Sequence, residues 1–299
     1  MIGKIKRWLS TSGVGILFLL PSFCGMGILY IFPLFYSWMV SFSRTALEFD
    51  FVGFTHYKEL FQSETFRRAW WNTFRFLILA IPTQLLLGLH MAKGIDYLYR
   101  KGKGWVFFFT VLLLPMILPS GSVAIFFRVL FDEKGEINDW VQKFGGEAVL
   151  WLDSSWSFFV LLLFYLWKNT AATMIIAVTG LRSIPQEVLH AAQLDGANSR
   201  QVFWQMQFPM IRPHLFFACL YGIVTVFRVS RQSHLLFGSY PHPSVYMIQN
   251  FLSNNFERFN MQRLSAAAIV TLMVFFVGIA GGSLVRFRKS KKRRNEEDL

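Results

Sequence analysis

Charge is scarce in this chain of 299 residues, and acidic charge is scarcer still. Only 16% of the residues are charged, with 30 Lys and Arg against 17 Asp and Glu, whereas 54% are hydrophobic and Phe alone occurs 34 times. A soluble domain carries about 25% charged residues, so the chain has too little polar surface for a water-soluble globule of this size. Intrinsic disorder is excluded as well, because it requires low hydrophobicity. We therefore expect an integral membrane protein.

Cysteine and catalytic motifs are also nearly absent. The only cysteines, Cys24 and Cys219, lie far apart in apolar stretches, where a free thiol behaves as a small hydrophobic group, so we expect neither a disulfide nor a metal pair. The sequence has no Gly-rich phosphate loop ending in Gly-Lys-Ser or Gly-Lys-Thr, no His-Glu-x-x-His pair and no Gly-x-Ser-x-Gly turn. It predicts no catalytic residue, no metal and no cofactor, and we do not expect an enzyme.

Hydrophobic segments, by contrast, are abundant. A helix needs about 20 mostly apolar residues to cross the hydrocarbon core of a bilayer, and six segments qualify. They lie near residues 13–41, 71–93, 104–128, 154–181, 213–230 and 264–285. The first follows a basic start, but its uncharged run is too long for a signal peptide, so we interpret it as an uncleaved span. The chain is predicted to be all-α, with one polytopic membrane domain over residues 1–299.

The uncharged stretch 232–256 is an apolar region that we do not interpret as a span. It contains Gly-Ser-Tyr-Pro-His-Pro at 238–243 and the pair Asn254-Asn255. Clusters of Gly, Pro and Asn mark turns, so we expect a loop between the fifth and sixth spans.

The distribution of Lys and Arg predicts the orientation. With six spans, both termini lie on the same side of the membrane. The two tails and the loops 93–103 and 182–212 carry 17 Lys and Arg, whereas the loops on the other side carry 9. Cytoplasmic segments are enriched in Lys and Arg, so both termini are predicted to be cytoplasmic. We interpret the basic run at 286–294 as a topology anchor beside the last span rather than a nucleic-acid site.

Polar residues concentrate in one cytoplasmic loop, at 183–213, between the fourth and fifth spans. Ser183 and Gln186 have the spacing of a capping box, which predicts a helix over 185–194. Asp195-Gly196 is expected to end it. One face of this helix is expected to hold Val188, Ala191, Ala192 and Asp195.

A second helical pattern in this loop begins at Val202 and runs to Pro209. The two patterns together predict a compact helix-turn-helix exposed to the cytosol. An amphipathic element of this kind suits docking into a groove of a partner protein. Periodicity alone is also consistent with an ordinary structured loop.

The same loop resembles a known motif. His190-Ala191-Ala192, then Gly196, then Met206-Gln207-Phe208-Pro209 match the spacing of the EAA motif. Its usual form is Glu-Ala-Ala, three residues, Gly, nine residues and Ile-x-Leu-Pro, so that His190, Met206 and Phe208 depart from the usual residues. Glu187, one helical turn before His190, resembles an extra acidic residue common in the carbohydrate branch. The loop is therefore similar to that of permease subunits of binding-protein-dependent ABC importers, in the carbohydrate (maltose-type) branch.

This resemblance extends over almost the whole chain. Similar patterns occur at residues 20–21, 32–37, 51–57, 72–73, 82–88, 114–119, 128–138 and 167–185. One region departs from the family. After the fifth span, Arg231 stands near a position that is commonly acidic, and Phe237-Gly238-Ser239 replaces a Gly-rich run.

The resemblance implies a transmembrane subunit that forms half of the translocation path for a sugar or oligosaccharide in a type I importer. Its partners would be a second permease in a heterodimer, two cytosolic ATPase subunits and an extracellular solute-binding protein, in the plasma membrane of a prokaryote. The helix-turn-helix would be the coupling element that contacts the ATPases. The residues expected to serve this contact are Glu187, His190, Ala191, Ala192, Asp195, Gly196, Ala197, Arg200 and Pro209.

Ionisable residues within the spans are candidates for function, because burial of a charge is costly. Arg75 and Arg128 lie near span ends and are expected to extend to the membrane surface, whereas Lys168 and Arg228 lie deeper. Aromatic and polar neighbours suit a sugar, which stacks on aromatic rings and forms hydrogen bonds. The candidates for the path are Tyr165, Trp167, Lys168, Asn169, Tyr221 and Arg228. For Lys168 and Arg228 the alternative is extension to the membrane surface or pairing with a neighbouring helix. For the aromatic residues the alternative is a lipid-facing or core position.

Two other functions stay open on the sequence. A permease for a non-sugar organic solute such as glycerol phosphate would share the same features. A stand-alone six-span carrier would need coupling groups in its spans, and Asp and Glu are absent from the cores of all six spans. That absence disfavours proton- or sodium-coupled transport.

Overall fold

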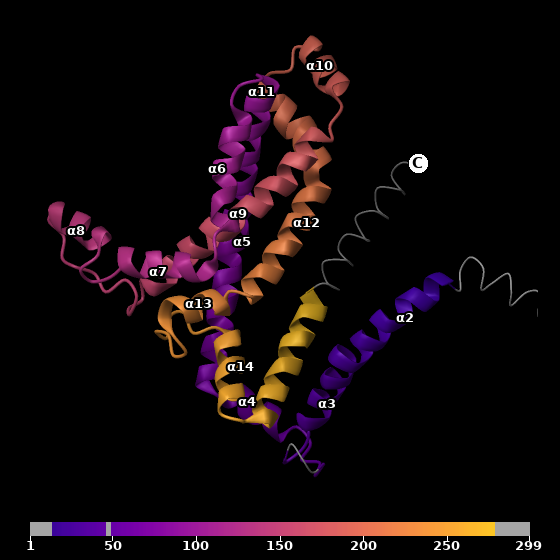
Figure 1. The fold of residues 1–299 in the computed structure, drawn as a ribbon, viewed down its shortest axis with the longest axis vertical. Coiled ribbons are helices and arrows are strands. Elements are labelled where there is room, and N and C mark those ends of the chain that lie inside the picture. Colours follow the sequence, from indigo (N-terminus) through magenta and orange to yellow (C-terminus); the bar gives the residue numbers. More distant parts are fainter. Residues whose placement is uncertain (1–13, 46–48, 279–299) are drawn as a thin grey trace, which may run out of the picture. The chain divides into compact units, whose positions relative to one another are not determined.

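The computed structural model describes residues 14–45 and 49–278, and within these ranges the chain folds as helices joined by turns and loops (Figure 1). It forms no β-strand there apart from one isolated backbone bridge between Ser43 and Phe51. Among the described residues, five helices are long and apolar enough to cross a membrane, or six if a bent pair counts as one span. The all-α, polytopic fold is confirmed.

The described residues divide into two compact units. The first contains the residues up to Glu64 and from Leu252 onward, and the second is Thr65–Phe251. The basic run at 286–294 and the end of the sixth predicted span lie outside the described residues.

The first unit contains two membrane-spanning helices. Its elements are α2 (Val14–Met26), the π-helical turn η2 (Gly27–Ile31), α3 (Phe32–Val40), α4 (Thr55–Gln62) and a last helix, Met261–Gly278. The segment Phe18–Val40 is apolar and buries none of its most hydrophobic window inside the chain. Gln262 Nε2 donates to the carbonyl of Arg44 at 3.1 Å, and Arg263 Nη2 donates to Ser63 Oγ at 2.6 Å. These bonds join the last helix to the polar turns of the same unit.

The second unit is a bundle with α9 at its centre. Its elements are α5 (Glu64–Arg100), α6 (Trp105–Ile117), α7 (Ser120–Leu130), α8 (Glu136–Lys143), α9 (Ser157–Arg182), α10 (Gln186–Leu194), α11 (Ser199–Gln201), the π-helical turn η3 (Val202–Gln207), α12 (Phe208–Phe227), α13 (Ser230–Phe237) and the beginning of α14 (Ile248–Glu257), which continues into the first unit. Helix α9 packs against α6 and α12. Gly88 allows close contact between α5 and α9, because a Cβ atom there would lie 2.5 Å from Thr173 Cγ2.

The third predicted span, 104–128, is not one straight helix. It breaks between α6 and α7, whose axes differ by 90°. The break follows from Pro119, since a proline disfavours the helical conformation of the residue before it and Leu118 is extended, with φ −59° and ψ 139°. Lys168 Nζ, on α9, donates a hydrogen bond to the freed carbonyl of Leu118.

The stretch 232–256 was expected to be a loop, and this prediction is wrong at both of its ends. Helix α13 covers its beginning and α14 its end, so that only residues 238–247 are irregular. Asn254 and Asn255 do not form a turn. Both lie inside α14 and are buried, because tertiary packing overrides their preference for turns.

Buried amide groups hold the segment 132–156, which contains α8, and the irregular segment 238–247. We name these two segments the distal region. Asn138 Nδ2 donates to the carbonyls of Asp132, Glu133 and Val149, and its Oδ1 accepts from Val149 N and Trp151 Nε1. Similarly, Asn72 on α5 donates to two carbonyls of the segment 243–246, at 2.7 and 3.0 Å. The distal region thus has its backbone fixed by side chains that are almost fully buried.

Arg75, a neighbour of Asn72 on α5, also contacts the distal region. Its Nη2 donates to the carbonyl of Ser244 at 3.1 Å, and its guanidinium lies 4.0 Å from the ring centre of Phe158. The sequence predicts that the side chain of Arg75 extends to the membrane surface. The structure instead places it half-buried, in contact with other parts of the same unit.

Candidate coupling site

The loop 183–213 forms one end of the second unit, where α10 and α11 lie beyond the bundle of α5, α6, α9 and α12 (Figure 1). Helix α10 begins at Gln186 and ends at Leu194, in agreement with the prediction of 185–194. Asp195 ends it, and Gly196 takes a φ of +81°, a left-handed conformation that glycine adopts without steric cost.

The capping box predicted from Ser183 and Gln186 does not form. The residue before α10 is Pro185, and no side chain caps this end of the helix. Ser183 Oγ instead donates to the carbonyl of Gly180 at 2.8 Å, while Gln186 is engaged by Arg100. Helix α9 extends to Arg182. The hydroxyl of Ser183 therefore bonds a carbonyl in the last turn of α9 rather than a backbone N–H at the beginning of α10.

A capping box does begin the second helix of the loop. Asn198 Oδ1 accepts from Gln201 N at 2.9 Å, and Gln201 Oε1 accepts from Asn198 N at 2.8 Å. The helix then continues without interruption from Ser199 to Phe227, so the predicted end at Pro209 is wrong. Pro209 lies directly after the π-helical turn η3, where an irregular backbone replaces the regular ladder of hydrogen bonds that a proline interrupts. The second arm of the loop is therefore continuous with the fifth span.

The buried residues of α10 are Leu189 and Ala192. Of the other residues predicted to share a face with Ala192, Val188 is half-buried and Ala191 and Asp195 are exposed. Leu194 is 90% exposed, although it is apolar, and sequence reasoning missed it. The spacing indicates this exposure, because a residue five positions after Leu189 points to a different side of the helix from Leu189, which is buried.

The predicted coupling residues lie mostly on the surface of this loop. Ala192 is buried, and Ala197 and Pro209 are half-buried. The others are exposed, namely Glu187, His190, Ala191, Asp195, Gly196 and Arg200. The structure thus brings the predicted residues together on one accessible element.

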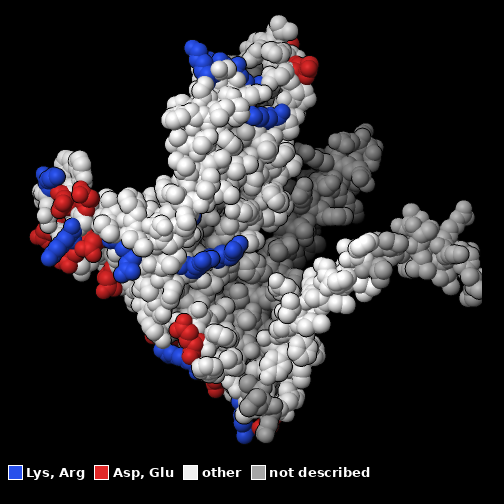
Figure 2. Space-filling view, in the orientation of Figure 1, with Lys and Arg blue, Asp and Glu red and all other residues white. Residues whose placement is uncertain are grey.

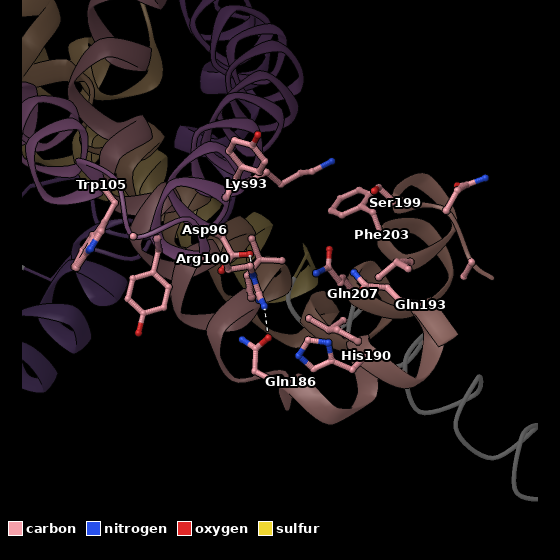
Figure 3. Close-up of a pocket in the computed structure, with 18 residues that line it drawn as sticks. Lys93, Asp96, Arg100, Trp105, Gln186, His190, Gln193, Ser199, Phe203 and Gln207 are labelled. Atoms are coloured by element: carbon pink, nitrogen blue, oxygen red, sulfur yellow. Dashed lines mark hydrogen bonds and ion pairs between the residues drawn. The ribbon is translucent and has the colours of Figure 1, made fainter. Parts of the chain in front are cut away.

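A cleft of about 1190 Å³, lined by both polar and apolar side chains, lies between this loop and the end of α5. Figure 3 shows Lys93, Asp96 and Arg100 of α5 on one side, and Gln186, His190 and Phe203 of the loop on the other. Arg100 Nε donates to Asp96 Oδ2 and Arg100 Nη1 to Gln186 Oε1, both at 2.7 Å. Sequence reasoning did not identify this cleft, because its two sides are more than 80 residues apart.

Positive charge surrounds this end of the bundle. Figure 2 shows Lys and Arg side chains there beside a smaller acidic area, and the adjoining length of the bundle is uncharged on this face. The guanidinium of Arg182 lies 3.7 Å from the ring centre of Tyr99 and 4.7 Å from that of Trp105, which is within the range of a cation–π contact. Among residues 14–45 and 49–278, no group of three or more His, Cys, Asp or Glu side chains is placed to hold a metal ion.

The path candidates occupy different environments. Tyr165 is fully buried, and its hydroxyl donates to Gln84 Oε1 at 2.8 Å and lies 2.8 Å from Thr225 Oγ1. Gln84 Nε2 in turn donates to Thr173 Oγ1 at 2.8 Å. This hydrogen-bond network joins α5, α9 and α12 in the interior of the bundle. Gln84 was missed as a functional residue, although a Gln within an apolar span is itself a signal.

The remaining path candidates do not belong to this network through their side chains, except that Asn169 Nδ2 donates to the carbonyl of Tyr165 at 2.8 Å. Lys168 is 8% exposed and contacts the break between α6 and α7. Trp167 is 38% exposed, Tyr221 is half-buried and Arg228 is exposed. The candidates are therefore spread between the interior and the surface of the second unit.

Comparison with known proteins identifies the family. The family model described as "Binding-protein-dependent transport system inner membrane component" matches residues 84–294. The chain is 28% identical over 288 residues to the multiple sugar-binding transport system permease protein MsmF of Streptococcus mutans, covering 93% of this chain and 91% of that protein. It is 27% identical over 241 residues to the sulfoquinovosyl glycerol transport system permease protein SmoG of Agrobacterium fabrum, covering 79% and 77%.

A solved structure shares the fold. The crystal structure of a bacterial ABC transporter involved in the import of the acidic polysaccharide alginate includes a chain with a TM-score of 0.83 and 20% identity, and the match covers 95% of this chain and 99% of that chain. The family match spans more than half of this chain and agrees with the EAA-like loop. The chain therefore belongs to the inner membrane components of binding-protein-dependent transport systems, the permeases of ABC importers.

Proposed function

We propose that this permease forms half of the translocation path for a sugar or oligosaccharide, and that the loop 183–213 couples the path to ATP hydrolysis by separate ATPase subunits. The observation that carries the proposal is the geometry of the loop. Helix α10 is presented at the end of the bundle with an exposed polar and apolar surface, and the second arm is continuous with a membrane span. A groove on an ATPase would receive the exposed face of α10.

The coupling mechanism follows from this continuity. The helix Ser199–Phe227 runs from the second arm of the loop into the fifth span, with the π-helical turn η3 and Pro209 near its beginning. Movement of α10 with a closing ATPase dimer would therefore be passed to the fifth span through this helix. Such tilts switch a central cavity between openings on the two sides of a membrane.

The partners in this proposal are a second permease that differs from this chain, two cytosolic ATPases and an extracellular solute-binding protein. Both termini are cytoplasmic, in the plasma membrane of a prokaryote, as the distribution of Lys and Arg favours. The apolar segment Phe18–Val40, unburied within the chain, offers a surface for lipid or for the second permease. Co-purification with an ATPase tests the assembly, and a stand-alone carrier would purify without one.

A sugar is the proposed solute because similar permeases serve sugars and because aromatic and polar side chains line the candidate path. Trp167 and Tyr221 are accessible enough to stack on a sugar ring, and Arg228 is exposed. Tyr165, Lys168 and Asn169 already form hydrogen bonds within the chain, so they would contact the solute only in another conformation. Direct binding of candidate solutes to the cognate binding protein decides between a sugar and glycerol phosphate.

Substitution of the loop tests the coupling role. Gly196→Pro is expected to abolish uptake, because proline cannot adopt the φ of +81° found there. The double variant Glu187→Ala with Asp195→Ala is expected to reduce uptake while the protein still inserts. The matched control is Glu136→Ala with Asp139→Ala, which removes two exposed acidic groups from α8. Import at the wild-type rate by both loop variants would show that the loop does not couple transport.

Lys168→Ala tests the role of the buried cation. We expect uptake to fall while assembly is retained, because the carbonyl of Leu118 loses its partner and the α6–α7 break is no longer held in one geometry. Uptake is measured in vesicles, and assembly by co-purification with the other subunits. Unchanged uptake would remove Lys168 from the translocation path and from its gate.

A further inference from the structure

The side chain of Arg100, at the end of α5, has one partner on α5 and one on the coupling loop. The guanidinium of Arg100 donates from Nε to Asp96 Oδ2 and from Nη1 to Gln186 Oε1, both at 2.7 Å (Figure 3). Gln186 is the first residue of α10. We name this arrangement the Arg100 bridge.

The two bonds of the Arg100 bridge are unequal. Asp96 is only 7% exposed, and it bonds Arg100 as an ion pair within α5. Both bonds have a charged donor, but only the ion pair adds the attraction between two opposite charges. Gln186 is neutral and exposed, so its bond can exchange with water. Arg100 therefore stays bound to Asp96 of α5, whereas its hydrogen bond to Gln186 of α10 can break and form again.

A second contact ties the other arm of the loop to the same helix. The Nζ atom of Lys93 lies 3.6 Å above the ring centre of Phe203, in the π-helical turn η3. Lys93 and Arg100 are seven residues apart, which is about two helical turns, so they lie on the same side of α5. One side of α5 thus contacts both arms of the helix-turn-helix.

Helix α5 connects this contact with the interior of the bundle. It is continuous from Glu64 to Arg100, and Gln84 lies on it about 24 Å from Arg100 along the axis. Gln84 bonds Tyr165 and Thr173 on α9. A displacement of the end of α5 is therefore delivered to the hydrogen-bond network that joins α5, α9 and α12.

We propose that the Arg100 bridge transmits the movement of α10 to α5, so that the coupling loop drives the second span as well as the fifth. The proposal rests on the coupling role of the loop proposed above. Asp96 orients Arg100, Arg100 contacts Gln186, and all three are positioning residues that touch neither solute nor nucleotide. The fifth span is connected to the loop through the peptide chain, whereas the second span is connected through this bridge.

The test uses the complete transporter in proteoliposomes, with ATP hydrolysis and solute uptake measured in the same vesicles. Gln186→Ala removes the acceptor on α10 and leaves the ion pair in place. We expect the ratio of solute imported to ATP hydrolysed to fall about fivefold or more, with the rate of hydrolysis nearly unchanged. Gln186→Glu supplies a stronger acceptor and is expected to keep the ratio at the wild-type value. Gln142→Ala, which truncates an exposed glutamine on α8, is the matched control.

A second variant removes the bridge from the side of α5. Arg100→Gln alone would leave the buried Asp96 without its partner, so it is combined with Asp96→Asn. We expect this double variant to assemble with its partners and to show the same fall in the ratio as Gln186→Ala. A wild-type ratio in Gln186→Ala and in the double variant overturns the proposed bridge and leaves the coupling role of the loop intact. Failure of the unmodified chain to co-purify with an ATPase overturns the proposed function itself.

Discussion

The two ends of helix α5 contact irregular segments in opposite ways. Near its beginning, α5 holds the distal region through Asn72, which is buried and donates to two carbonyls. Near its end, α5 holds the coupling loop through Lys93 and Arg100, which are exposed and contact one ring and one neutral side chain. A buried carbonyl that loses its donor is costly, whereas an exposed bond is readily replaced by water. The distal region is therefore held more firmly to α5 than the coupling loop is.

The largest effect is expected from Asn138→Ala. This change removes a side chain that satisfies three carbonyls, one backbone N–H and the indole of Trp151. Because these groups are left without partners in a buried site, we expect the free energy of unfolding to fall by about 3 kcal/mol. Thermal unfolding of the detergent-solubilised protein measures the change. A melting temperature equal to that of the wild type would show that the distal region is not held by its buried amides.

A smaller effect is expected from the same substitution in the coupling loop, Asn198→Ala. Asn198 caps the second helix through one exposed capping box, and loss of such a cap costs about 1 kcal/mol. The two variants make an identical chemical change, so their difference measures the contrast between the two regions directly. Equal losses of stability would contradict it.

The smallest effect on stability is expected from Leu194→Ser. Leu194 is 90% exposed and packs against nothing that its loss would unfold, so the change in stability should lie within about 0.5 kcal/mol. Its exposed apolar surface is nevertheless the kind that a partner groove buries. We expect weaker co-purification with the ATPase, and the exposed Leu150→Ser in the distal region serves as the control. Unaltered binding would place the contact elsewhere on α10.

Much of the fold was predictable because it depends on local sequence. The spans follow from apolar runs, and the first coupling helix follows from its pattern and from Asp195-Gly196 as its end. The break at Leu118-Pro119 was missed because the run 104–128 is apolar throughout, and a proline inside a span does not by itself show how sharply the helix bends. The helical ends of 232–256 were missed because Asn254 and Asn255 are held by tertiary packing rather than by their own preference for turns.

The candidate site was predictable only in part, for a similar reason. The resemblance to the EAA motif located the coupling loop, and the structure places most of its residues on one exposed element. The contact between Arg100 and Gln186 joins residues 86 positions apart. A periodic pattern in the sequence does not indicate which residues so far apart come into contact. Leu194 was missed because it is not one of the residues that define the EAA motif.

The break in the third hydrophobic segment has a consequence for biogenesis. Helix α6 has 13 residues and a length of about 20 Å, which is less than the hydrocarbon core of about 30 Å. During synthesis this segment emerges before α9, so Lys168 is not yet present to donate a hydrogen bond to the carbonyl of Leu118. We expect the bend at Pro119 to be held in one geometry only when α9 arrives. Cysteine labelling at Ile125, compared between chains truncated before and after α9, would report the change. Pro119 then sets where the third span bends, and the order of synthesis decides when Lys168 fixes the bend.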